Sequence, residues 1–409
     1  MKTPQGITVM TVTETIRGAF RLPRSLVRAG AIVSALFVAA CDPAGTAGTG
    51  TQTGQMIDPK QPVPVALLVP SGTGSNDLEW LARSLTNSAK MAAADAQGAT
   101  IDLRVYPAGS EPGQAVAQAN KAADEGAKII LGPLFADSAN AVGNAMKPRG
   151  INVLSFSNNP DIAGGNVFIL GNSFDNVANR LVRYSVANGK RRILMVAEND
   201  PAGQVGARAI EKAIQANRAT LAGVANHTVS TSGIDAAIPN IAAAANSGNV
   251  DAIFMTANQG AVLPYLMDKL NGAGVSNQTT QMMGLTRWDQ PAARLQIKGV
   301  QGGWFAIPDT ARKAQFDQRY AAAYGEKPHD LGSLGYDGVA AISALVRAGK
   351  SNALTTAGLT QNSGFAGING AFRLRRDGSN DRALAIATVQ NGQVVVLDPA
   401  PKSFSGFGL

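Results

Sequence analysis

Residues 63–95 read VPVALLVPSGTGSNDLEWLARSLTNSAKMAAAD, and this stretch decides the fold class. Its first seven residues form an apolar run with a proline near the start, which is typical of a strand buried on both faces of a sheet. A glycine-containing turn follows, and from Leu78 onward apolar residues recur at helical spacing. The stretch therefore predicts a buried strand followed by a helix, as in an α/β protein.

The same alternation continues along the chain on both sides of Gly171. The predicted strands are residues 101–106, 128–131, 151–157, 192–197, 250–255 and 280–285, and the predicted helices are residues 78–96, 112–127, 137–147, 176–187, 203–216, 236–245 and 261–270. Strands separated by helices of this length form parallel sheets with helices on both faces. Two runs of this kind predict two doubly wound, Rossmann-like lobes.

The C-terminal part follows a different pattern. A predicted helix at residues 335–348 precedes segments that alternate by twos, at residues 370–375, 383–389 and 394–397. Asn391 and Gly392 stand between the last two segments, and Asn-Gly between apolar runs is a strong hairpin signal.

The N-terminus has the pattern of a secretory signal. Four arginines, Arg17, Arg21, Arg24 and Arg28, precede a 12-residue apolar run at residues 29–40. The run is shorter than the roughly 20 residues of a membrane-spanning helix, and it ends in small residues. We therefore expect residues 1–40 to be a cleaved signal peptide.

Cys41 is the chain's only cysteine and follows Val38-Ala39-Ala40, which resembles the bacterial lipobox. A lone cysteine can also be a buried free thiol, but the next 20 residues are rich in Gly, Thr and Pro and offer no core. The sequence therefore predicts a lipid on Cys41, a flexible tether at residues 41–61, and anchoring to a membrane on the periplasmic side of the envelope.

Composition excludes several function classes. With 45% hydrophobic and 16% charged residues, the 409-residue chain can bury a sizeable core. The formal charge of +8 falls to about +4 without residues 1–40, and no basic block carries interleaved aromatic residues. We therefore expect no nucleic-acid partner, and a single cysteine leaves no disulfide framework.

No catalytic or cofactor motif stands out. His227 and His329 are far apart in the chain and lack neighbouring ligand-type residues, so no metal site is expected. The Gly72–Asp77 turn is similar to a dinucleotide fingerprint, but Asp77 replaces the third glycine, and its charge would face a pyrophosphate. The favoured interpretation is a glycine-rich turn with Asp77 capping the following helix. The sequence thus predicts neither an enzyme nor a bound cofactor.

Three phrases carry a family resemblance: PRGINVLSFSNNP at residues 148–160, GYDGVAAISALVRA at 335–348, and FAGINGAFRLRRDGSNDRALAIATVQNGQVVVL at 365–397. With Gly132-Pro133-Leu134 they resemble the type I periplasmic binding proteins of the branched-chain amino-acid receptor group. The resemblance covers about residues 62–400. It implies two lobes joined by three crossings, with ligand between them; lobe 1 would hold residues 62–171 and 303–372, and lobe 2 residues 172–302 and 373–402.

Within that group the chain looks most like the penicillin-binding protein activators, on the phrases at residues 65–95 and 127–147. That resemblance implies a non-enzymatic, lipid-anchored regulator whose partner is a peptidoglycan synthase. The alternative is a substrate-binding lipoprotein that passes an amino acid or another small polar solute to an ABC permease.

The resemblance also implies positions for a ligand cleft. The candidates are Ser71, Thr73, Ala136, Asp137, Ser157, Asn158, Asn159, Ala202, Arg287 and Trp288. The receptors have a serine where Ala136 stands, a threonine in place of Asn159 and an aromatic residue in place of Ala202. We therefore expect free branched-chain amino acids to bind poorly, while the polar candidates leave room for another small polar ligand.

Arg373, Arg375 and Arg376 are candidates for a partner-binding surface. They lie along a predicted strand of lobe 2. Arginine is over-represented at binding hot spots, so this edge is the expected contact with a partner protein.

Overall fold

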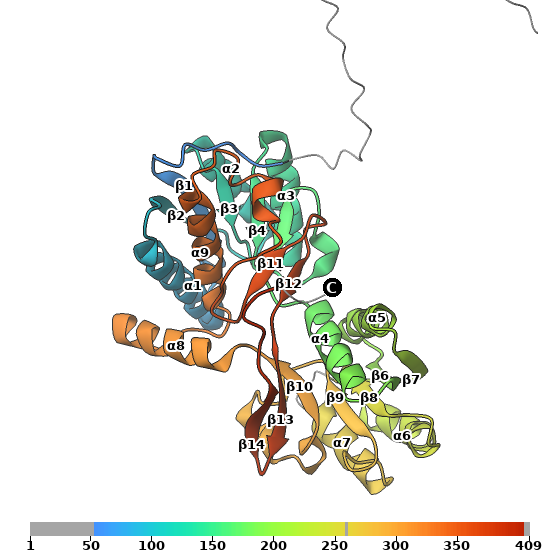
Figure 1. The fold of residues 1–409 in the computed structure, drawn as a ribbon. Coiled ribbons are helices and arrows are strands. Elements are labelled where there is room, and N and C mark those ends of the chain that lie inside the picture. The colour runs from blue at the N-terminus through green and yellow to red at the C-terminus, as the bar shows by residue number, and fades with distance from the viewer. Residues whose placement is uncertain (1–52, 258–260, 405–409) are drawn as a thin grey trace, which may run out of the picture. The chain divides into compact units, whose positions relative to one another are not determined.

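A computed structural model describes residues 53–257 and 261–404, which belong to one compact unit (Figure 1). The predicted signal peptide, Cys41 and the first part of the predicted tether lie outside the described residues. Within those residues, no helix has the length and apolar character needed to cross a membrane.

Lobe 1 is built on a parallel sheet of five strands in the order β2-β1-β3-β4-β5. The strands are β1 (Val63–Val69), β2 (Ile101–Pro107), β3 (Ile129–Leu131), β4 (Asn152–Ser155) and β5 (Val167–Ile169). The helices that follow the first three are α1 (Asn76–Asp95), α2 (Pro112–Asp124) and α3 (Ala136–Met146), with the 3-10 turns η1 (Lys147–Arg149) and η2 (Pro160–Ile162). The predicted strand-helix alternation of this lobe is confirmed.

The apolar run of β1 is buried on both faces, as the sequence predicted. Val65, Leu67 and Val69 pack against α1 and α9 (Ser333–Arg347), whereas Ala66 and Leu68 pack against α2 and α3. Figure 1 shows α1 and α9 over one face of the sheet and α2 and α3 over the other. Because successive strand residues point to opposite faces, a continuous apolar run requires a helix layer on each side.

Lobe 2 contains a seven-stranded sheet in the order β14-β13-β10-β9-β8-β6-β7. Its strands are β6 (Arg192–Glu198), β7 (Thr220–His227), β8 (Ala252–Met255), β9 (Gln281–Gly284), β10 (Trp304–Ile307), β13 (Ala385–Gln390) and β14 (Gln393–Asp398). The strands β6 to β10 pair in parallel, and β13 and β14 add antiparallel neighbours at one edge. The predicted hairpin at Asn391 and Gly392 joins β13 to β14.

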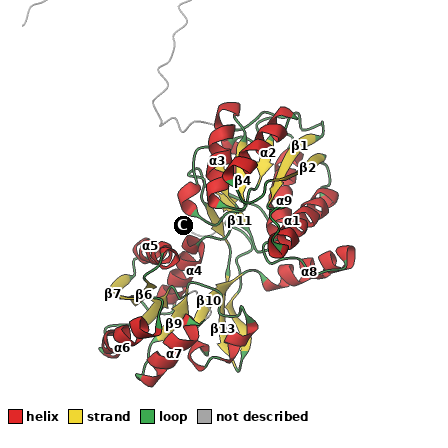
Figure 2. Cartoon of the chain, turned by 180° about the vertical axis from the view of Figure 1, so that it is seen from behind, coloured by secondary structure: helices red, strands yellow, loops and turns green. Residues whose placement is uncertain are grey.

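Helices cover both faces of the second sheet as well (Figure 2). One layer holds α6 (Thr231–Asn246) and α7 (Val262–Gly272), and the other α4 (Phe174–Ala187) and α5 (Pro201–Ala216). The 3-10 turns η3 (Ala292–Gln296) and η4 (Lys298–Val300) precede β10. The predicted fold class, two doubly wound lobes joined by three crossings, is confirmed.

Two predicted lobe boundaries are wrong. The strand β10 pairs with β9 and β13, so the chain returns to lobe 1 after Ile307 and not before residue 303. The hairpin of β11 (Phe372–Leu374) and β12 (Asn380–Arg382) packs Phe372 and Leu374 into the lobe 1 core, so the last crossing lies between Arg382 and β13. Both strands of that hairpin and β10 are three or four residues long, which leaves too little periodicity to assign them.

The predicted tether also ends too late. Thr53 Oγ1 donates to Asn152 Oδ1 over 2.6 Å, and its carbonyl accepts the N–H of Thr356 over 2.8 Å. Ile57 is 8% exposed in the lobe 1 core, and its N–H donates to Ser351 O. Residues 53–61 are therefore part of the folded body, because one apolar residue and three hydrogen bonds hold a segment whose composition predicted only a linker.

Candidate functional site

Most of the predicted cleft residues of lobe 1 lie at one edge of its sheet. Ser71 and Thr73 follow β1, Ala136 and Asp137 begin α3 after β3, and Ser157 to Asn159 follow β4. Since β1, β3 and β4 are neighbours in a parallel sheet, their carboxyl ends meet there, which is where α/β folds bind ligands.

Several of these side chains stabilise loops. Ser157 is buried, and its Oγ accepts the N–H of Asn159 over 3.1 Å. The Asn159 Oδ1 in turn accepts the N–H of Asp161 over 2.9 Å at the start of η2. Asn158 and Asp137 are exposed. The hydrogen bonds of Ser157 and Asn159 are therefore used inside the lobe.

The turn after β1 is capped differently from the prediction. Ser75 Oγ, not Asp77, accepts the N–H of Leu78 at the start of α1. The Glu79 carboxylate accepts the N–H groups of Gly72 and Thr73, over 2.6 and 3.2 Å. These two amides, which a dinucleotide site would present to phosphate, already have an anionic partner.

The two neighbouring cleft candidates after β9, Arg287 and Trp288, lie in different surroundings. Arg287 lines a cavity, whereas Trp288 is fully buried in the lobe 2 core and packs against Gly284 and Gly303. The prediction of Trp288 as a cleft residue is wrong, because the glycines leave room for its ring beneath the strands. Ala202 is exposed in the first turn of α5 and does not line that cavity.

The cavity is lined by residues of both lobes and measures about 830 Å³. Its walls come from the start of α4, the β9–η3 loop, the end of β10 and the start of α8 (Thr310–Tyr324), the loop before α9, and the last crossing. The apolar part of the lining is Phe174, Val177, Leu285, Ala306, Ile307, Pro308, Ala314, Leu331, Leu334, Leu384 and Val394, and the polar part is Asn172, Thr286, Arg287, Asp289, Gln290, Arg294, Thr310, Lys313, Asp317, Asp330, Asn369 and Arg382. Such a volume with a mixed lining is ordinary for a small-molecule site.

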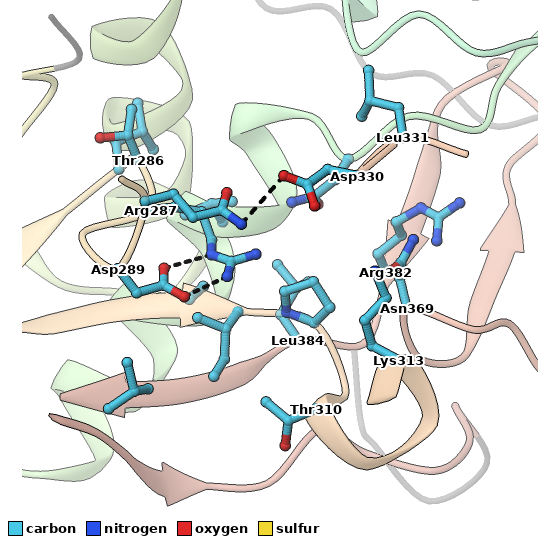
Figure 3. A pocket seen from close by; sticks show the side chains of 18 of the residues that line it. Thr286, Arg287, Asp289, Thr310, Lys313, Asp330, Leu331, Asn369, Arg382 and Leu384 are labelled. Atoms are coloured by element: carbon cyan, nitrogen blue, oxygen red, sulfur yellow. Dashed lines mark hydrogen bonds and ion pairs between the residues drawn. The ribbon is translucent and has the colours of Figure 1, made fainter. Parts of the chain in front are cut away.

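Two ion pairs sit in the cavity wall. The Asp289 carboxylate accepts two parallel hydrogen bonds from the Arg287 guanidinium, one from Nε over 2.6 Å and one from Nη2. On α8, Lys313 Nζ donates to Asp317 Oδ1 over 2.6 Å. Each pair offers a cation and an anion beside the cavity. Figure 3 shows the first pair and, separately, Asp330 accepting a hydrogen bond, which Gln290 donates over 3.4 Å.

Arg382 connects the cavity to the crossings. Its guanidinium donates to Leu170 O and, over 3.1 Å, to Asp337 Oδ2, and its backbone N–H donates to Asn176 Oδ1. Burial raises the pKa of the Asp337 carboxyl, against the opposing effects of Arg382 and of the Ile368 N–H, which donates to it over 2.6 Å. Arg382 thus ties helix α9, the first crossing and α4 together beneath the cavity.

Sequence reasoning missed most of the cavity. Lys313 and Asp317 lie on α8, which was not predicted. Asn369 and Arg382 lie in the phrase at residues 365–397, which predicted strands and a family but no cavity residue. Of the missed cavity residues, Asp289 was the one that the sequence could have predicted, because a carboxylate two residues after Arg287 in a strand-end loop suggests an ion pair. Among the described residues, no group of three or more metal-ligand types is found.

The comparisons with known proteins decide the family. The family model of the periplasmic binding proteins matches residues 62–393. The chain belongs to the periplasmic binding protein family. This confirms the family resemblance, and the family is one of binding proteins of the periplasm.

Solved structures with the same fold share little sequence. One is described as a branched-chain amino acid ABC transporter from Rhodospirillum rubrum, at 17% identity and a TM-score of 0.70, covering 82% of this chain and all of that one. A substrate-binding protein from Desulfitobacterium hafniense, in complex with Leu, has 19% identity and a TM-score of 0.59, with coverages of 82% and 100%. A solute-binding protein from R. palustris, in complex with benzoate, has 18% identity and a TM-score of 0.54, with coverages of 84% and 97%. The search of curated proteins found no match to the chain.

In this periplasmic binding protein, two of the three arginines predicted to contact a partner, Arg373 and Arg375, form ion pairs within the chain. Arg373 Nε donates to Asp381 Oδ2 over 2.6 Å, and Arg375 Nη2 lies 2.8 Å from the same oxygen. The Arg373 guanidinium also stacks on Phe404, 4.9 Å from the ring centre. Arg376 is exposed. The hairpin that carries them belongs to lobe 1 and not to lobe 2 as predicted.

Proposed function

We propose that this protein is the solute-binding component of an ABC importer, exported, lipid-anchored at Cys41, and binding one small solute between its lobes. The observation that carries the proposal is the 830 Å³ cavity lined by both lobes in a chain of the periplasmic binding protein family. The structural neighbours described as ABC transporter proteins support the same function. A permease is therefore the proposed partner.

The composition of the cavity wall suggests the class of solute. One part is apolar, with Phe174, Leu285 and Leu331 among its residues, while Arg287 and Lys313 provide paired charges elsewhere in the wall. A solute with an apolar body and a polar or charged group would contact both parts. A ligand carboxylate could share the Arg287 or Lys313 cation with the aspartate that already pairs with it.

Free leucine, isoleucine and valine fit this site poorly. The expected amino-acid contacts are replaced by Ala136, Asp137, Asn159 and Ala202, and none of these residues lines the cavity. We propose that the solute is held by the cavity residues near the crossings instead of by the receptors' usual contacts.

The peptidoglycan-synthase activator remains an untested alternative with less support. The comparisons favour a solute-binding protein, and the arginines expected to contact a synthase are mostly paired with Asp381. We therefore retain the solute-binding function as the conclusion.

Thermal-shift screening of residues 42–409 against a panel of amino acids, short peptides, aromatic acids and sugars tests the proposal. A solute at about 100 times its Kd stabilises the protein by about 2.7 kcal/mol, which raises Tm by roughly 5 °C or more. We expect at least one amphipathic compound to give such a shift, and branched-chain amino acids to give none. A panel without any stabilising compound, together with co-purification of a cell-wall synthase, would favour the activator.

A further inference from the structure

The N-terminal segment enters the folded body at a defined place. Thr53 is hydrogen-bonded to Asn152, the first residue of β4, and Gln55 Nε2 donates to Arg149 O over 2.5 Å just before that strand. Ile57 donates to Ser351 O in the loop after α9. These contacts all lie at the amino edge of the lobe 1 sheet, whereas the predicted cleft residues of that lobe lie at its carboxyl edge.

The connection from this edge to the proposed lipid is short. Eleven residues, 42–52, separate Cys41 from Thr53. A chain of this length reaches at most about 40 Å when fully extended. A lipid on Cys41 would therefore hold the amino edge of lobe 1 close to the membrane surface.

That edge is rich in basic side chains. The basic residues in its loops and helix ends are Lys60, Lys121, Lys128, Lys147, Arg149, Arg347 and Lys350, and the acidic ones are Asp58, Asp95, Asp124 and Glu125. Asp124 pairs with Arg149, and Asp95 pairs with Arg319 of α8. Within the described part of the chain, the side chains of Lys60, Lys147, Arg347 and Lys350 are exposed and in no ion pair.

An exposed apolar side chain accompanies these charges. Met56 is 57% exposed between the buried Thr53 and Ile57, the largest exposed fraction among the big apolar residues described. A flexible thioether beside basic side chains suits the boundary between lipid headgroups and acyl chains, where lysine and arginine extend toward phosphates.

We propose that the surface formed by Met56, Lys60, Lys147, Arg347 and Lys350 is a docking face for anionic phospholipid headgroups. It holds lobe 1 with its amino edge toward the membrane that carries the anchor. Each basic residue near an anionic bilayer makes the free energy of membrane binding more favourable, and salt screens this electrostatic attraction. The inference uses the tether of the proposed function, but its test requires neither the lipid anchor on Cys41 nor a solute, so its failure leaves solute binding untouched.

The test measures co-sedimentation of residues 42–409, which contain the whole folded body and lack Cys41, with phosphatidylcholine vesicles with and without phosphatidylglycerol. We expect binding only when phosphatidylglycerol is present, and weaker binding at high salt. Replacing Lys60, Lys147, Arg347 and Lys350 by glutamine should lower the partition coefficient by about fivefold per charge at low salt. Met56→Ser should lower it further.

A matched control lies at the amino edge of lobe 2, where Lys190, Arg191, Arg218 and Lys298 are found. Their replacement by glutamine removes the same charge from a face without the N-terminal segment, and should leave vesicle binding within about twofold of wild type. Tm measurement on both variants checks that the fold is kept. No binding to phosphatidylglycerol vesicles by the wild type, or an equal loss in both variants, would overturn the proposal.

Discussion

Cys41 is the residue on which the proposed location of the protein depends. It is the chain's only thiol, it follows Val38-Ala39-Ala40, and the glycine- and threonine-rich segment after it offers no core to bury it. We expect Cys41→Ser to release the protein from membranes or to leave the precursor uncut, because no other residue can carry a thioether-linked lipid. Membrane fractionation and intact-mass measurement check this. A wild-type mass without acyl groups would contradict the anchor.

Asp251 provides a pH-dependent test at the residue scale. Its pKa is lowered to about 2, first by the hydrogen bond from the Arg192 side chain and also by the N–H groups of Arg191 and Arg192. A carboxyl whose folded pKa is lowered adds stability above its ordinary value of 3.8, and this stability is lost as the pH falls toward about 2. Since the side chain is 21% exposed, we expect Asp251→Asn to cost only roughly 1–2 kcal/mol at neutral pH.

Urea unfolding of wild type and Asp251→Asn across pH 7 to 3 measures this difference. The free-energy gap between the two proteins should be constant down to about pH 4 and narrow below it. If the difference in unfolding free energy were the same at all pH values, the cost of Asp251→Asn would come from disturbed packing or hydrogen-bond geometry and not from the lost charge.

The residue scale is also where prediction from the sequence was weakest. Arg287 lines the cavity, but its neighbour Trp288 does not, because the space for its ring is made by Gly284 and Gly303, from two other segments of the chain. The side chain of Asn159 was predicted to face ligand, yet it caps a local turn. Such assignments depend on tertiary neighbours that one sequence does not reveal.

At the scale of elements, the N-terminal segment is held by a backbone conformation that needs glycine. Gly54 has φ +113°, and a Cβ there would lie 2.4 Å from both Leu354 O and Thr355 Cα. We expect Gly54→Ala to cost at least about 2 kcal/mol, since the backbone is strained and the segment must also move away from lobe 1. Gly74 is the matched control: its φ is +76°, and a Cβ there would have no neighbouring atom within 4 Å.

Gly74→Ala should cost only the left-handed strain, roughly 1 kcal/mol. Chemical denaturation of both variants provides the comparison. If Gly54→Ala were no worse than Gly74→Ala, the docking of residues 53–57 would contribute nothing to the stability of the body.

The elements that the sequence predicted are the long, periodic ones. The apolar run of β1 and the helical spacing of α1 are clear, whereas α8 was missed because only Phe316 and Tyr320 of its 15 residues are buried. Those two and Tyr324 recur at every fourth position, a signal that a polar background obscured. The edge strand β7, with small residues and exposed positions alternating with partly exposed ones, lacks an apolar run altogether.

At the scale of the whole molecule, the C-terminal phrase at residues 365–397 was the best guide to topology. It predicted a return to the second sheet and the β13–β14 hairpin, both of which the structure contains. It could not place the crossings, since Arg382 and Asp337 meet across 45 residues and mark the boundary only in three dimensions. Arg382 also lines the cavity. The lobe boundaries and the cavity residues were therefore missed for the same reason, because both depend on contacts between segments far apart in the sequence.

The central claim is that one small solute binds between the lobes, and calorimetric titration of a compound from the screen tests it most directly. Ala314 of α8 lines the cavity, whereas Ala322 is exposed on the same helix and does not line it. The account predicts one solute per wild-type chain, at least tenfold weaker binding to Ala314→Trp, and unchanged binding to Ala322→Trp. Equal affinity for wild type and Ala314→Trp, or a loss only in Ala322→Trp, would contradict a solute site in this cavity.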